Sequence, residues 1–504
     1  MTRFQRLFFM TAFAVCSFGF STHPAFRIFL AGDSTMADKP QIDNPEHGWG
    51  QELPLYFSEN VDIFNYARNG RSTRSFLYQG IWDAMLEKMQ PGDYVFIQFG
   101  HNDSKKSDSS RYAAPQTDYR NNLLRMICDA QAKKAIPVLI TPVNRRKYDT
   151  AGQFVDQHGE YPDVVRDVAK KERVFLIDLH QKSKTLLEDL GAEGSKKYFL
   201  TSVKPHVYRS LPNGKDDNTH FTNVGAVSIA GLVVEGIREL HLPLEKELIL
   251  DSMPALPGNG VVVGLDEYFN NERKKIDDTL SIPHHYTWDD TTDGGFSEFA
   301  KMLDWSGADI DTVQTAPTKE ALDRFSVYII VDPDSPKEND SPNYIDRRDG
   351  DVIEQWVRNG GTLVLLANDT LNCEFDHLNT LSERFGIHFN GDSKHYFRNT
   401  AADYQLGWSA HLPKHPLFDG VRGLFIKQVS SMALKSPAVP LLTEEGSCLM
   451  ATAQAGKGFV IAVGDPWIYN EYMHAARVPD GYQNYDAAKQ FSRWLCDISK
   501  KVRE

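Results

Sequence analysis

The sequence predicts two α/β domains, in each of which helices pack against a sheet. Short apolar strands alternate with helical stretches in both halves of the chain, a pattern typical of layered α/β folds. The length of 504 residues exceeds what one hydrophobic core supports. A segment rich in Pro and Gly, residues 251–260, breaks both periodicities and predicts the boundary between the domains.

The composition is that of an ordinary globular protein, with 41% apolar and 24% charged residues. The net charge of −13 disfavours a nucleic-acid partner, because the chain offers no basic stripe for a polyanion. An anionic substrate would therefore require positive side chains to be gathered locally at the binding cleft.

The first 25 residues are typical of a signal peptide. Arg3 and Arg6 precede an apolar run from Leu7 to Phe20, which is too short to cross a membrane. Cys16 follows Val15 rather than a small residue, so we expect no lipoprotein anchor. No later stretch is long enough for a membrane span, and we expect an exported protein, periplasmic or extracellular.

The first domain is expected over residues 26–250, as a parallel sheet with helices on both faces. Its predicted strands are Arg27–Leu30, Asp62–Asn65, Tyr94–Phe99, Ile136–Thr141 and Val174–Asp178. Its predicted helices include Tyr119–Lys133, Tyr161–Lys170 and Thr222–Leu240, the last of which carries an apolar stripe and closes the domain.

The second domain is expected over residues 261–504, after the linker. Its predicted strands are Val261–Leu265, Val327–Val331, Thr362–Leu366 and Gly458–Gly464. Its predicted helices are Phe296–Leu303, Gly350–Asn359, Leu378–Phe385 and Tyr485–Ser499. Without the predicted signal peptide, the cysteines are Cys128, Cys373, Cys448 and Cys496, with no paired Cys-x-x-Cys spacing, so neither a zinc site nor a disulfide scaffold is indicated. One disulfide in the second half is an alternative to the buried free thiols that we expect.

A candidate nucleophile follows the first predicted strand, in Gly32-Asp33-Ser34-Thr35. Gly-Asp-Ser turns the chain sharply at the carboxyl end of a strand, where open α/β sheets have their sites. Ser34 would be exposed at this edge of the sheet. The tetrapeptide alone is equally compatible with an ordinary loop, so the prediction depends on the residues downstream.

Those residues supply a base and its orienting acid. His220 can accept a proton from the serine, and Asp217, three residues earlier, can turn back and hold the imidazole through its other nitrogen. Asp216 is a second choice for the acid because of its different spacing. Without a nucleophile nearby, the stretch Asp-Asn-Thr-His would be interpreted as the N-terminal cap of the helix that follows.

Acyl transfer also requires hydrogen-bond donors for the oxyanion. The backbone N–H groups of Ser34 and Gly70 and the side-chain amide of Asn102 are the candidates, each after a predicted strand. Gly70 alone would be a turn glycine and Asn102 alone a loop amide. Together at one edge of the sheet, they indicate a hydrolytic site.

These four blocks resemble the blocks of the SGNH (GDSL-type) hydrolases. A closer resemblance is to the rhamnogalacturonan acetylesterases, the twelfth carbohydrate esterase family, and it covers roughly Arg27–Leu240. It is carried by the stretches Gly32–Ala37, His47–Gln51, Thr141–Arg146 and His158–Pro162. The resemblance implies a flavodoxin-like, three-layer SGNH fold, no cofactor, no metal, and removal of acetyl groups from pectic rhamnogalacturonan. It places Ser34, Gly70, Asn102 and His220 in the four family roles.

Several side chains could contact an acidic sugar polymer. Arginines after predicted strands could bind uronate carboxylates bidentately, and two aromatic residues could pack on a sugar ring. The candidates are Arg71, Arg74, Arg145, Arg146, Trp49 and Tyr148. The alternative for each arginine is a solvated side chain or an ion pair with a nearby acid.

The second domain resembles the class I glutamine-amidotransferase-like α/β domains. The enzymes of that group need a cysteine at a strand-to-helix turn, and the candidate turn Leu365–Thr370 has none, so we expect a non-catalytic accessory domain. The aromatic stretches His284–Asp290 and Trp467–Tyr472 could bind carbohydrate or cover the esterase cleft. The alternative that we favour is an aromatic core at a domain interface.

The sequence thus predicts an exported serine esterase that deacetylates a pectic polysaccharide or oligosaccharide through an acyl-enzyme. One alternative is another SGNH activity, such as a xylan acetylesterase or a lysophospholipase-like esterase, although polar residues around the site argue against a long acyl chain. A carbohydrate-binding protein with an inactive esterase domain is the alternative from a different class.

Overall fold

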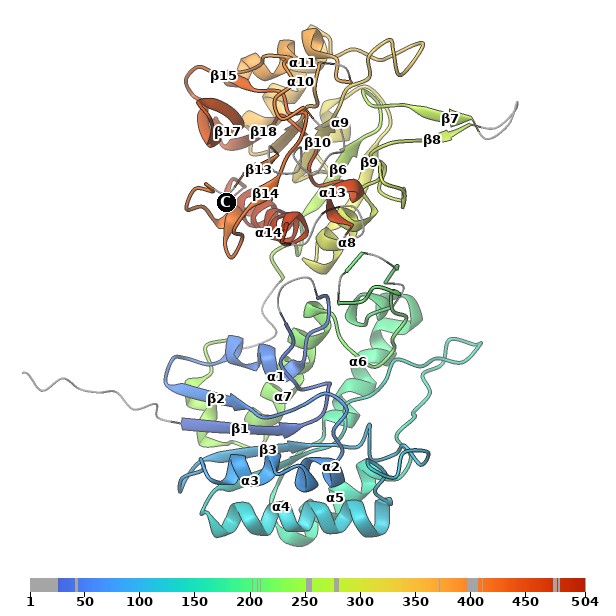
Figure 1. Ribbon diagram of the computed structural model, residues 1–504, viewed down its shortest axis with the longest axis vertical. Helices are drawn as coiled ribbons and strands as arrows, with labels where there is room; N and C mark the ends of the chain where they lie inside the picture. Colours follow the sequence, from blue (N-terminus) through green and yellow to red (C-terminus); the bar gives the residue numbers. More distant parts are fainter. Residues whose placement is uncertain are drawn as a thin grey trace, which may run out of the picture.

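The structure is a computed structural model with two sheet-containing halves stacked along its long axis (Figure 1). It describes residues 26–40, 44–201, 203–205, 207–208, 210–250, 256–275, 281–370, 372–396, 407–409, 411–474, 478 and 481–503. The predicted signal peptide and half of the predicted linker, residues 251–255, lie outside the described residues. The domain bounds therefore stay predictions.

The first sheet has five parallel strands in the order β2-β1-β3-β4-β5, which confirms the predicted parallel sheet. The strands are β1 Phe26–Gly32, β2 Val61–Asn65, β3 Tyr94–Gln98, β4 Ile136–Ile140 and β5 Phe175–Ile177. In this order, β1 and β3 are neighbours. The chain adds β2 on the far side of β1, and it adds β4 and β5 on the far side of β3. A crevice is expected beyond the carboxyl ends of the strands at such a point.

Helices cover both faces of this sheet, which gives a three-layer domain (Figure 1). One face packs on α1, α6 and α7, and the other on α2, α3, α4 and α5. Their bounds are α1 Trp49–Glu52, α2 Thr73–Tyr78, α3 Ile81–Leu86, α4 Arg120–Ala132, α5 Tyr161–Glu172, α6 Leu179–Gly194 and α7 Asn223–Glu239; short helices are η1 Leu53–Tyr56, η2 Pro115–Tyr119, η3 Lys196–Tyr198 and η4 Pro243–Glu247. Alternation along β1 produces both faces, because Ile28 and Leu30 belong to one core and Phe29 to the other.

Helix α7 lies unusually close to its neighbours, and this closeness fixes the loop before it. A Cβ on Gly236 would lie 2.5 Å from Cγ2 of Ile177, and one on Gly225 would lie 2.0 Å from the carbonyl oxygen of Tyr198, so no larger residue fits at either position. The Thr222 side chain caps the helix by accepting the N–H of Gly225. The residues just before Thr222 are therefore held against the sheet.

The second sheet has nine strands and is mixed. Its parallel part has the order β9-β6-β10-β11-β18, which repeats the order of the first sheet when the strands are counted along the chain. These strands are β6 Val262–Asp266, β9 Asp309–Val313, β10 Val327–Val331, β11 Thr362–Leu366 and β18 Gly458–Val463. Antiparallel strands extend it beyond β18: β12 Ile387–Phe389, β15 Met432–Leu434, β16 Val439–Glu444 and β17 Ser447–Ala455.

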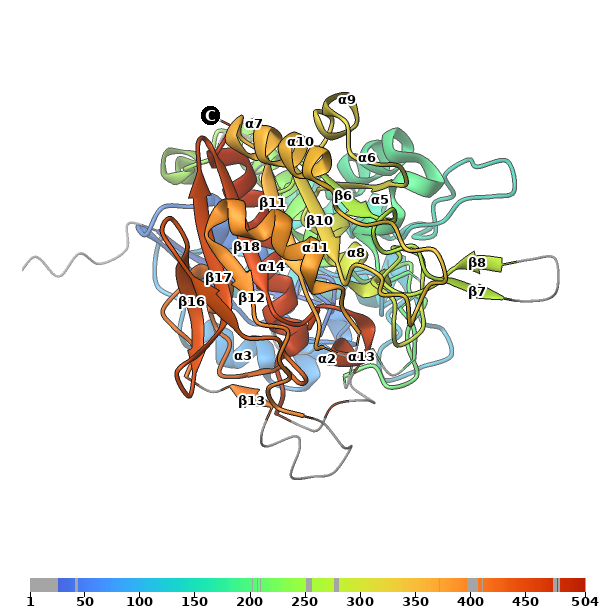
Figure 2. The same ribbon diagram turned by 90° about the horizontal axis from the view of Figure 1, so that it is seen from above.

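Helices again cover both faces of the sheet. One core includes α8, α13 and α14, and the other includes α9, α10 and α11. Their bounds are α8 Ser297–Trp305, α9 Lys319–Leu322, α10 Arg347–Arg358, α11 Phe375–Ser382, α13 Asn470–Met473 and α14 Asn484–Lys501; short helices are η5 Glu383–Phe385 and η6 Pro416–Phe418. Two small hairpins add β7 Arg273–Lys275 with β8 Ser281–Pro283, which project from the body in Figure 2, and β13 Trp408–Ser409 with β14 Leu424–Phe425. The predicted second α/β domain is confirmed, whereas its likeness to glutamine amidotransferases stays a prediction.

The four cysteines in the described part of the chain are free thiols, as we favoured over a disulfide. Cys373 and Cys496 are buried, and Cys128 is exposed. Burial raises the pKa of the Cys373 thiol well above its ordinary value, so this group does not offer a thiolate nucleophile. No helix among the described residues has the length and apolarity needed to cross a membrane.

The two domains meet at a small core next to the loop before α7. Leu200, Val207 and Tyr208 of the first domain are buried against Trp305 at the end of α8 and Tyr485 at the start of α14. The Tyr208 and Tyr485 rings lie edge to face with centroids 4.8 Å apart, and their hydroxyls are hydrogen-bonded. The second domain therefore buries apolar side chains of the segment that leads to Asp217 and His220.

We expect Tyr485→Ala to lower the free energy of unfolding by about 2 kcal/mol, because it exposes the Tyr208 ring and leaves a cavity. Tyr485→Phe keeps the ring and removes only the hydroxyl, so its cost should be about 1 kcal/mol. Denaturant unfolding of the full chain measures both values. Equal values for the two variants would contradict a role of the ring in joining the domains.

Candidate active site

The predicted site residues come together beyond the carboxyl ends of the first sheet. Ser34 follows β1, Gly70 follows β2 and Asn102 follows β3, while Asp217 and His220 precede α7. The loop with the last two is held at its base, since the N–H of Asp217 donates to Leu200 O and the N–H of Leu200 donates to His220 O. The fold thus delivers five side chains or backbone groups to the crevice between β1 and β3.

Ser34, His220 and Asp217 form a continuous hydrogen-bonded chain. The Ser34 Oγ lies 2.7 Å from Nε2 of His220, and His220 Nδ1 lies 2.6 Å from Oδ2 of Asp217. The imidazole contacts the hydroxyl with one nitrogen and the carboxylate with the other. With the proton on Nδ1, Nε2 is available to accept the proton of the serine hydroxyl.

The Asp217 carboxyl is held in its ionised form. Burial raises its pKa, but the hydrogen bond and charge of His220, the backbone N–H of Thr219 and the charge of Lys215 lower it by more, so its pKa lies well below the ordinary value. Its Oδ1 accepts the N–H groups of Thr219 and His220 at 2.7 and 3.0 Å. A carboxylate with these bonds keeps one orientation toward the imidazole.

An ion-pair network that the sequence analysis missed surrounds this chain. Lys215 Nζ lies 3.1 Å from Asp217 Oδ2 and 2.8 Å from Glu46 Oε2, and Lys39 Nζ lies 2.7 Å from Glu46 Oε1. Glu46 Oε1 is 4.0 Å from Nε2 of His220. Burial raises the pKa of Glu46, but the charges of His220 and Lys39 and the hydrogen bonds of both lysines outweigh burial and lower it. His220 thus has an ionised carboxylate near its outward nitrogen.

The three predicted oxyanion donors follow β1, β2 and β3 at one edge of the sheet. In the described part of the chain, no protein acceptor binds the backbone N–H of Ser34 or of Gly70. The Asn102 Nδ2 donates to Arg71 O at 2.9 Å, which uses one of its two hydrogens and ties the amide to the Gly70 loop. Gly70 has φ +75°, a left-handed conformation that favours glycine. This arrangement leaves three donors free to bind an oxyanion.

Asp33 and His101, neighbours of the predicted residues, hold the two loops together. Asp33 is fully buried, accepts the N–H and hydroxyl of Thr35 at 3.0 and 2.8 Å, and lies 3.0 Å from His101 Nδ1. Burial raises the Asp33 pKa, but the charge and hydrogen bond of His101 and the bonds of Thr35 outweigh burial, and the pKa falls to about 2. The β1 and β3 loops are therefore linked by a buried contact between Asp33 and His101.

Positive side chains gather beside the oxyanion donors. The Nε atoms of Arg71 and Arg145 are buried and lack a hydrogen-bond partner among the described residues. The pKa of Lys105 is lowered by burial and then by the charges of Arg111 and Arg145, so these cations lie close together. A Cβ on Gly70 would lie 3.4 Å from Arg111 Nη1, which places Arg111 beside the donors as well. These cations are gathered locally on a protein that is acidic overall.

The prediction that Trp49 packs on a sugar ring is wrong. Trp49 is fully buried in the core of the first domain, and its indole N–H donates to Gln98 Oε1 at 2.7 Å. The apolar stretch after Trp49, with Leu53 and Tyr56 in the same core, turns this helix inward. Its ring is covered on both faces by the protein.

Three other predicted contacts are already engaged within the protein. Arg74 forms an ion pair with Asp118 at 2.7 Å. Arg146 donates to Ser195 Oγ and Asn218 Oδ1 and lies over the ring of Tyr148, whose hydroxyl donates to Leu187 O. A role of these side chains in substrate binding stays a prediction, and for Arg146 and Tyr148 it would require exchange of these contacts.

The sequence held only a weak signal for the missed residues. Lys215 lies two positions before Asp217, and the charge run Lys-Asp-Asp could have indicated an ion pair. Glu46 and Lys39 lie in a loop without periodicity, far from His220 in the chain. No group of three His, Cys, Asp or Glu side chains in the described part of the chain is arranged to hold a metal.

Comparison with known proteins agrees with this geometry. Residues 30–225 match the model of the GDSL-like lipase/acylhydrolase family. Rhamnogalacturonan acetylesterase RhgT of Bacillus subtilis (strain 168) is 43% identical over 224 residues, which are 44% of this chain and 94% of that protein. A rhamnogalacturonan acetylesterase of Emericella nidulans is 43% identical over 229 residues, which are 42% of this chain and 84% of that protein.

Solved structures similar to the chain include a lipase/acylhydrolase from Enterococcus faecalis, at 22% identity and a TM-score of 0.30, covering 43% of this chain and 96% of that one. A variant of an acetylxylan esterase from Geobacillus stearothermophilus has 13% identity and a TM-score of 0.31, and the match covers 43% of this chain and 95% of that one. The sequence matches carry the assignment. Through its first domain, the chain belongs to the GDSL-like lipase/acylhydrolase family and is a carboxylic ester hydrolase.

Proposed function

We propose that this protein is an exported serine esterase that removes acetyl groups from pectic rhamnogalacturonan through an acyl-enzyme intermediate. The observation that carries the mechanism is the hydrogen-bonded chain from Ser34 through His220 to Asp217. The acetylated pectic substrate is inferred from the relatives that are 43% identical to the first domain. Export is inferred from the predicted signal peptide, residues 1–25.

In the first half of the reaction, Ser34 Oγ attacks the acetyl carbonyl carbon while His220 Nε2 takes the hydroxyl proton. The carbonyl oxygen becomes an oxyanion, which the N–H groups of Ser34 and Gly70 and the amide of Asn102 bind. The bond from the carbonyl carbon to the sugar oxygen then breaks, and His220 gives its proton to that oxygen. The deacetylated sugar leaves, and the acetyl group remains on Ser34.

In the second half, a water molecule attacks the acyl carbon and gives a proton to His220. The tetrahedral intermediate uses the same three donors and collapses by breaking the bond to Ser34 Oγ, which regains a proton from His220. Asp217 stays ionised throughout because its pKa lies well below the ordinary value. Its role is to orient the imidazole and to stabilise the imidazolium form.

The cations beside the donors support an acidic polysaccharide as substrate. Arg71 and Arg145 have buried Nε–H groups for which the described part of the chain offers no acceptor, and Lys105 and Arg111 lie close by. A guanidinium matches the geometry of a carboxylate, so uronate groups next to an acetylated sugar would bind here. Burial lowers the pKa of Arg145, and an anion would relieve the cost of keeping this charge desolvated.

Acetate release from acetylated rhamnogalacturonan and acetylated xylan, measured with wild type and Ser34→Ala, tests both parts of the proposal. We expect release from the pectic polymer and a loss of about 10⁴-fold or more in Ser34→Ala, because no other group is placed to attack the carbonyl. Ser110→Ala, which removes an exposed serine hydroxyl, is the matched control and should retain full activity.

The outcomes separate mechanism from substrate. Release from xylan alone, abolished in Ser34→Ala, would keep the serine mechanism and exclude the pectic substrate. Activity that survives in Ser34→Ala would exclude Ser34 as the nucleophile. Absence of release from both polymers, while a small aryl acetate is still hydrolysed, would exclude both polysaccharides.

The network beside His220 predicts opposite shifts in pH dependence for two variants. Glu46→Gln removes a negative charge 4.0 Å from His220 Nε2, so the imidazolium form is less favoured and the acidic limb of kcat/KM should move to lower pH. Lys215→Met removes a cation 3.1 Å from Asp217, and the limb should move to higher pH. Each shift should be roughly 0.5–1 pH unit.

Protonation of Asp217 does not contribute to this limb, because its pKa lies well below the ordinary value. Profiles of aryl acetate hydrolysis for wild type, both variants and Glu87→Gln measure the shifts, and Glu87 is an exposed acid on another part of the domain. If the acidic limb moved in the same direction in Glu46→Gln and Lys215→Met, the result would contradict a base at His220 that is influenced by the charges of this network.

A further inference from the structure

We propose that the second domain has a binding site for a neutral sugar unit, in a pocket beyond the carboxyl ends of its parallel strands. The pocket has a volume of about 290 Å³, close to the lower end of the range for small-molecule sites, about 300–1,000 Å³. It therefore fits a single sugar ring better than a long oligosaccharide. The proposal is independent of the esterase reaction, because the site lies in the other domain.

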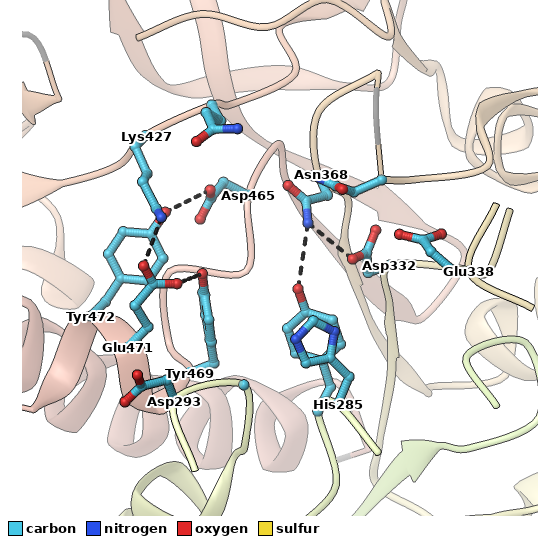
Figure 3. Close-up of a pocket in the computed structure, with 14 residues that line it drawn as sticks. His285, Asp293, Asp332, Glu338, Asn368, Lys427, Asp465, Tyr469, Glu471 and Tyr472 are labelled. Carbon is cyan, nitrogen blue, oxygen red and sulfur yellow. Dashed lines mark hydrogen bonds and ion pairs between the residues drawn. The ribbon is translucent and has the colours of Figure 1, made fainter. Parts of the chain in front are cut away.

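The position of the pocket is the one that the topology favours. Asp332 directly follows β10, Asn368 lies two residues beyond β11 and Asp465 lies two residues beyond β18, and all three line the pocket. Figure 3 shows the Asp465 carboxyl on one side of the cavity and Asn368 with Asp332 on the other. Both sheets share one strand order, so this is the edge at which the first domain has its own site.

Two buried carboxyl groups in the pocket wall lack part of their hydrogen bonding. Asp332 is 4% exposed and Asp465 is 3% exposed. One oxygen of each is satisfied, since Asp332 Oδ2 accepts Asn368 Nδ2 and Asp465 Oδ2 accepts the Tyr472 hydroxyl, both at 2.9 Å. The Oδ1 of each is buried and has no partner among the described residues. Buried acceptors without partners indicate a ligand that brings hydrogen-bond donors.

The other walls are aromatic and polar. Tyr286, Tyr469 and Tyr472 line the pocket with their rings packed edge to face against one another. The Asn368 amide also lies 3.4 Å from the Tyr286 hydroxyl, and Gln428 adds a second amide to the lining. A sugar site requires aromatic rings that pack on the apolar face of a pyranose. It also requires polar groups that bind the sugar hydroxyls, and here these are carboxyl and amide groups.

Backbone strain concentrates around the pocket. Four lining residues other than glycine have left-handed backbone conformations: His285, Tyr286, Asp332 and Gln428, with φ of +65°, +51°, +42° and +49°. Such conformations are unfavourable for residues with a Cβ and gather at ligand-binding sites. Here they turn side chains from three separate loops toward one cavity.

The charges of the lining select a neutral sugar. Besides Asp332 and Asp465, the pocket is lined by Glu338 and Glu471, and Glu471 is paired with Lys427, so a uronate would meet carboxyl groups beside a cation that is already paired. Burial raises the pKa of Asp332 to about 7 and that of Asp465 well above its ordinary value, so both carboxyls are readily protonated and can bind a hydroxyl without a net charge. Lys427, 2.7 Å from Glu471, already pairs this carboxylate with a cation.

Three sugars that share one ring but differ in charge test this proposal: galactose, galacturonate and galactosamine. Titration calorimetry with the full chain measures binding of each to wild type, to the double variant Asp332→Asn with Asp465→Asn, and to Asp419→Asn. Asp419 is an exposed acid of the same domain outside the pocket, so it matches the charge change without touching the site.

We expect galactose to bind wild type and Asp419→Asn with equal affinity. Its affinity for the double variant should be at least tenfold lower, because each Asp→Asn change replaces a carboxyl oxygen, which accepts, with an amide NH₂ group, which donates. Binding at the site is the binding to wild type that the double variant loses. This binding should be at least tenfold weaker for galacturonate and for galactosamine than for galactose. Unchanged aryl acetate hydrolysis and unchanged melting of the variant verify that it is folded.

Four results would overturn the proposal. If galactose does not bind wild type, the proposed site is excluded. If galactose binds the double variant as tightly as wild type, the sugar binds outside this pocket. Tighter binding of galactosamine, lost in the double variant, would mean a site for cationic amines. Tighter binding of galacturonate, lost in the same variant, would mean that the carboxyl groups do not repel a uronate.

Discussion

The packing of α7 positions the hydrogen bond between Ser34 and His220, which joins residues 186 positions apart in the chain. A single hydrogen bond contributes about 1 kcal/mol and cannot hold these loops together by itself. The geometry comes from the packing of α7, where Gly236 approaches Ile177 of β5 and the Tyr56 hydroxyl donates to Val227 O. Packing in the core positions α7, and α7 in turn fixes the loop with His220. The hydrogen bond between Ser34 and His220 forms because this packing brings the two side chains close together.

Both halves of the chain use the same topology but differ in the charge of the groups at the carboxyl edge of the sheet. Among the described residues, Arg71 and Arg145 beyond the first sheet carry buried N–H groups without acceptors, and Asp332 and Asp465 beyond the second carry buried oxygens without donors. The parallel strand order creates the crevice in each case, because neighbouring loops diverge there. The loops alone decide which ligand chemistry the crevice favours.

Much of this could be predicted from the sequence because it depends on local patterns. The parallel strands alternate with helices at short range, and Ser34, Gly70, Asn102, Asp217 and His220 lie in short blocks at the ends of strands or before a helix. The antiparallel strands β16 and β17 were missed because the turn between them is Glu445-Gly446, a weaker hairpin signal than Asn-Gly, although both residues adopt positive φ. The ion-pair network was missed because Lys39, Glu46 and Lys215 meet only in the folded chain.

Trp49 shows why residue type is a poor guide to a substrate contact. An aromatic residue in a loop near the nucleophile has the composition expected of a sugar platform, yet its neighbours Leu53 and Tyr56 commit that segment to the core. In the second domain, Tyr286, Tyr469 and Tyr472 come from stretches that we expected to form an aromatic core at a domain interface. They belong to the core of the second domain and also line its cavity. The fate of an aromatic ring depends on which other apolar residues share its face.

The contact between the domains links the second domain to the loop that carries Asp217 and His220. RhgT is matched over 94% of its length by 224 residues of this chain, so that protein has no room for a second domain of this size. The chemistry therefore does not require one. In this chain, however, Leu200, Val207 and Tyr208 form a buried cluster against which Trp305 and Tyr485 pack. Leu200 bonds to the backbone of both Asp217 and His220, so losing that cover would expose apolar surface directly beneath the base.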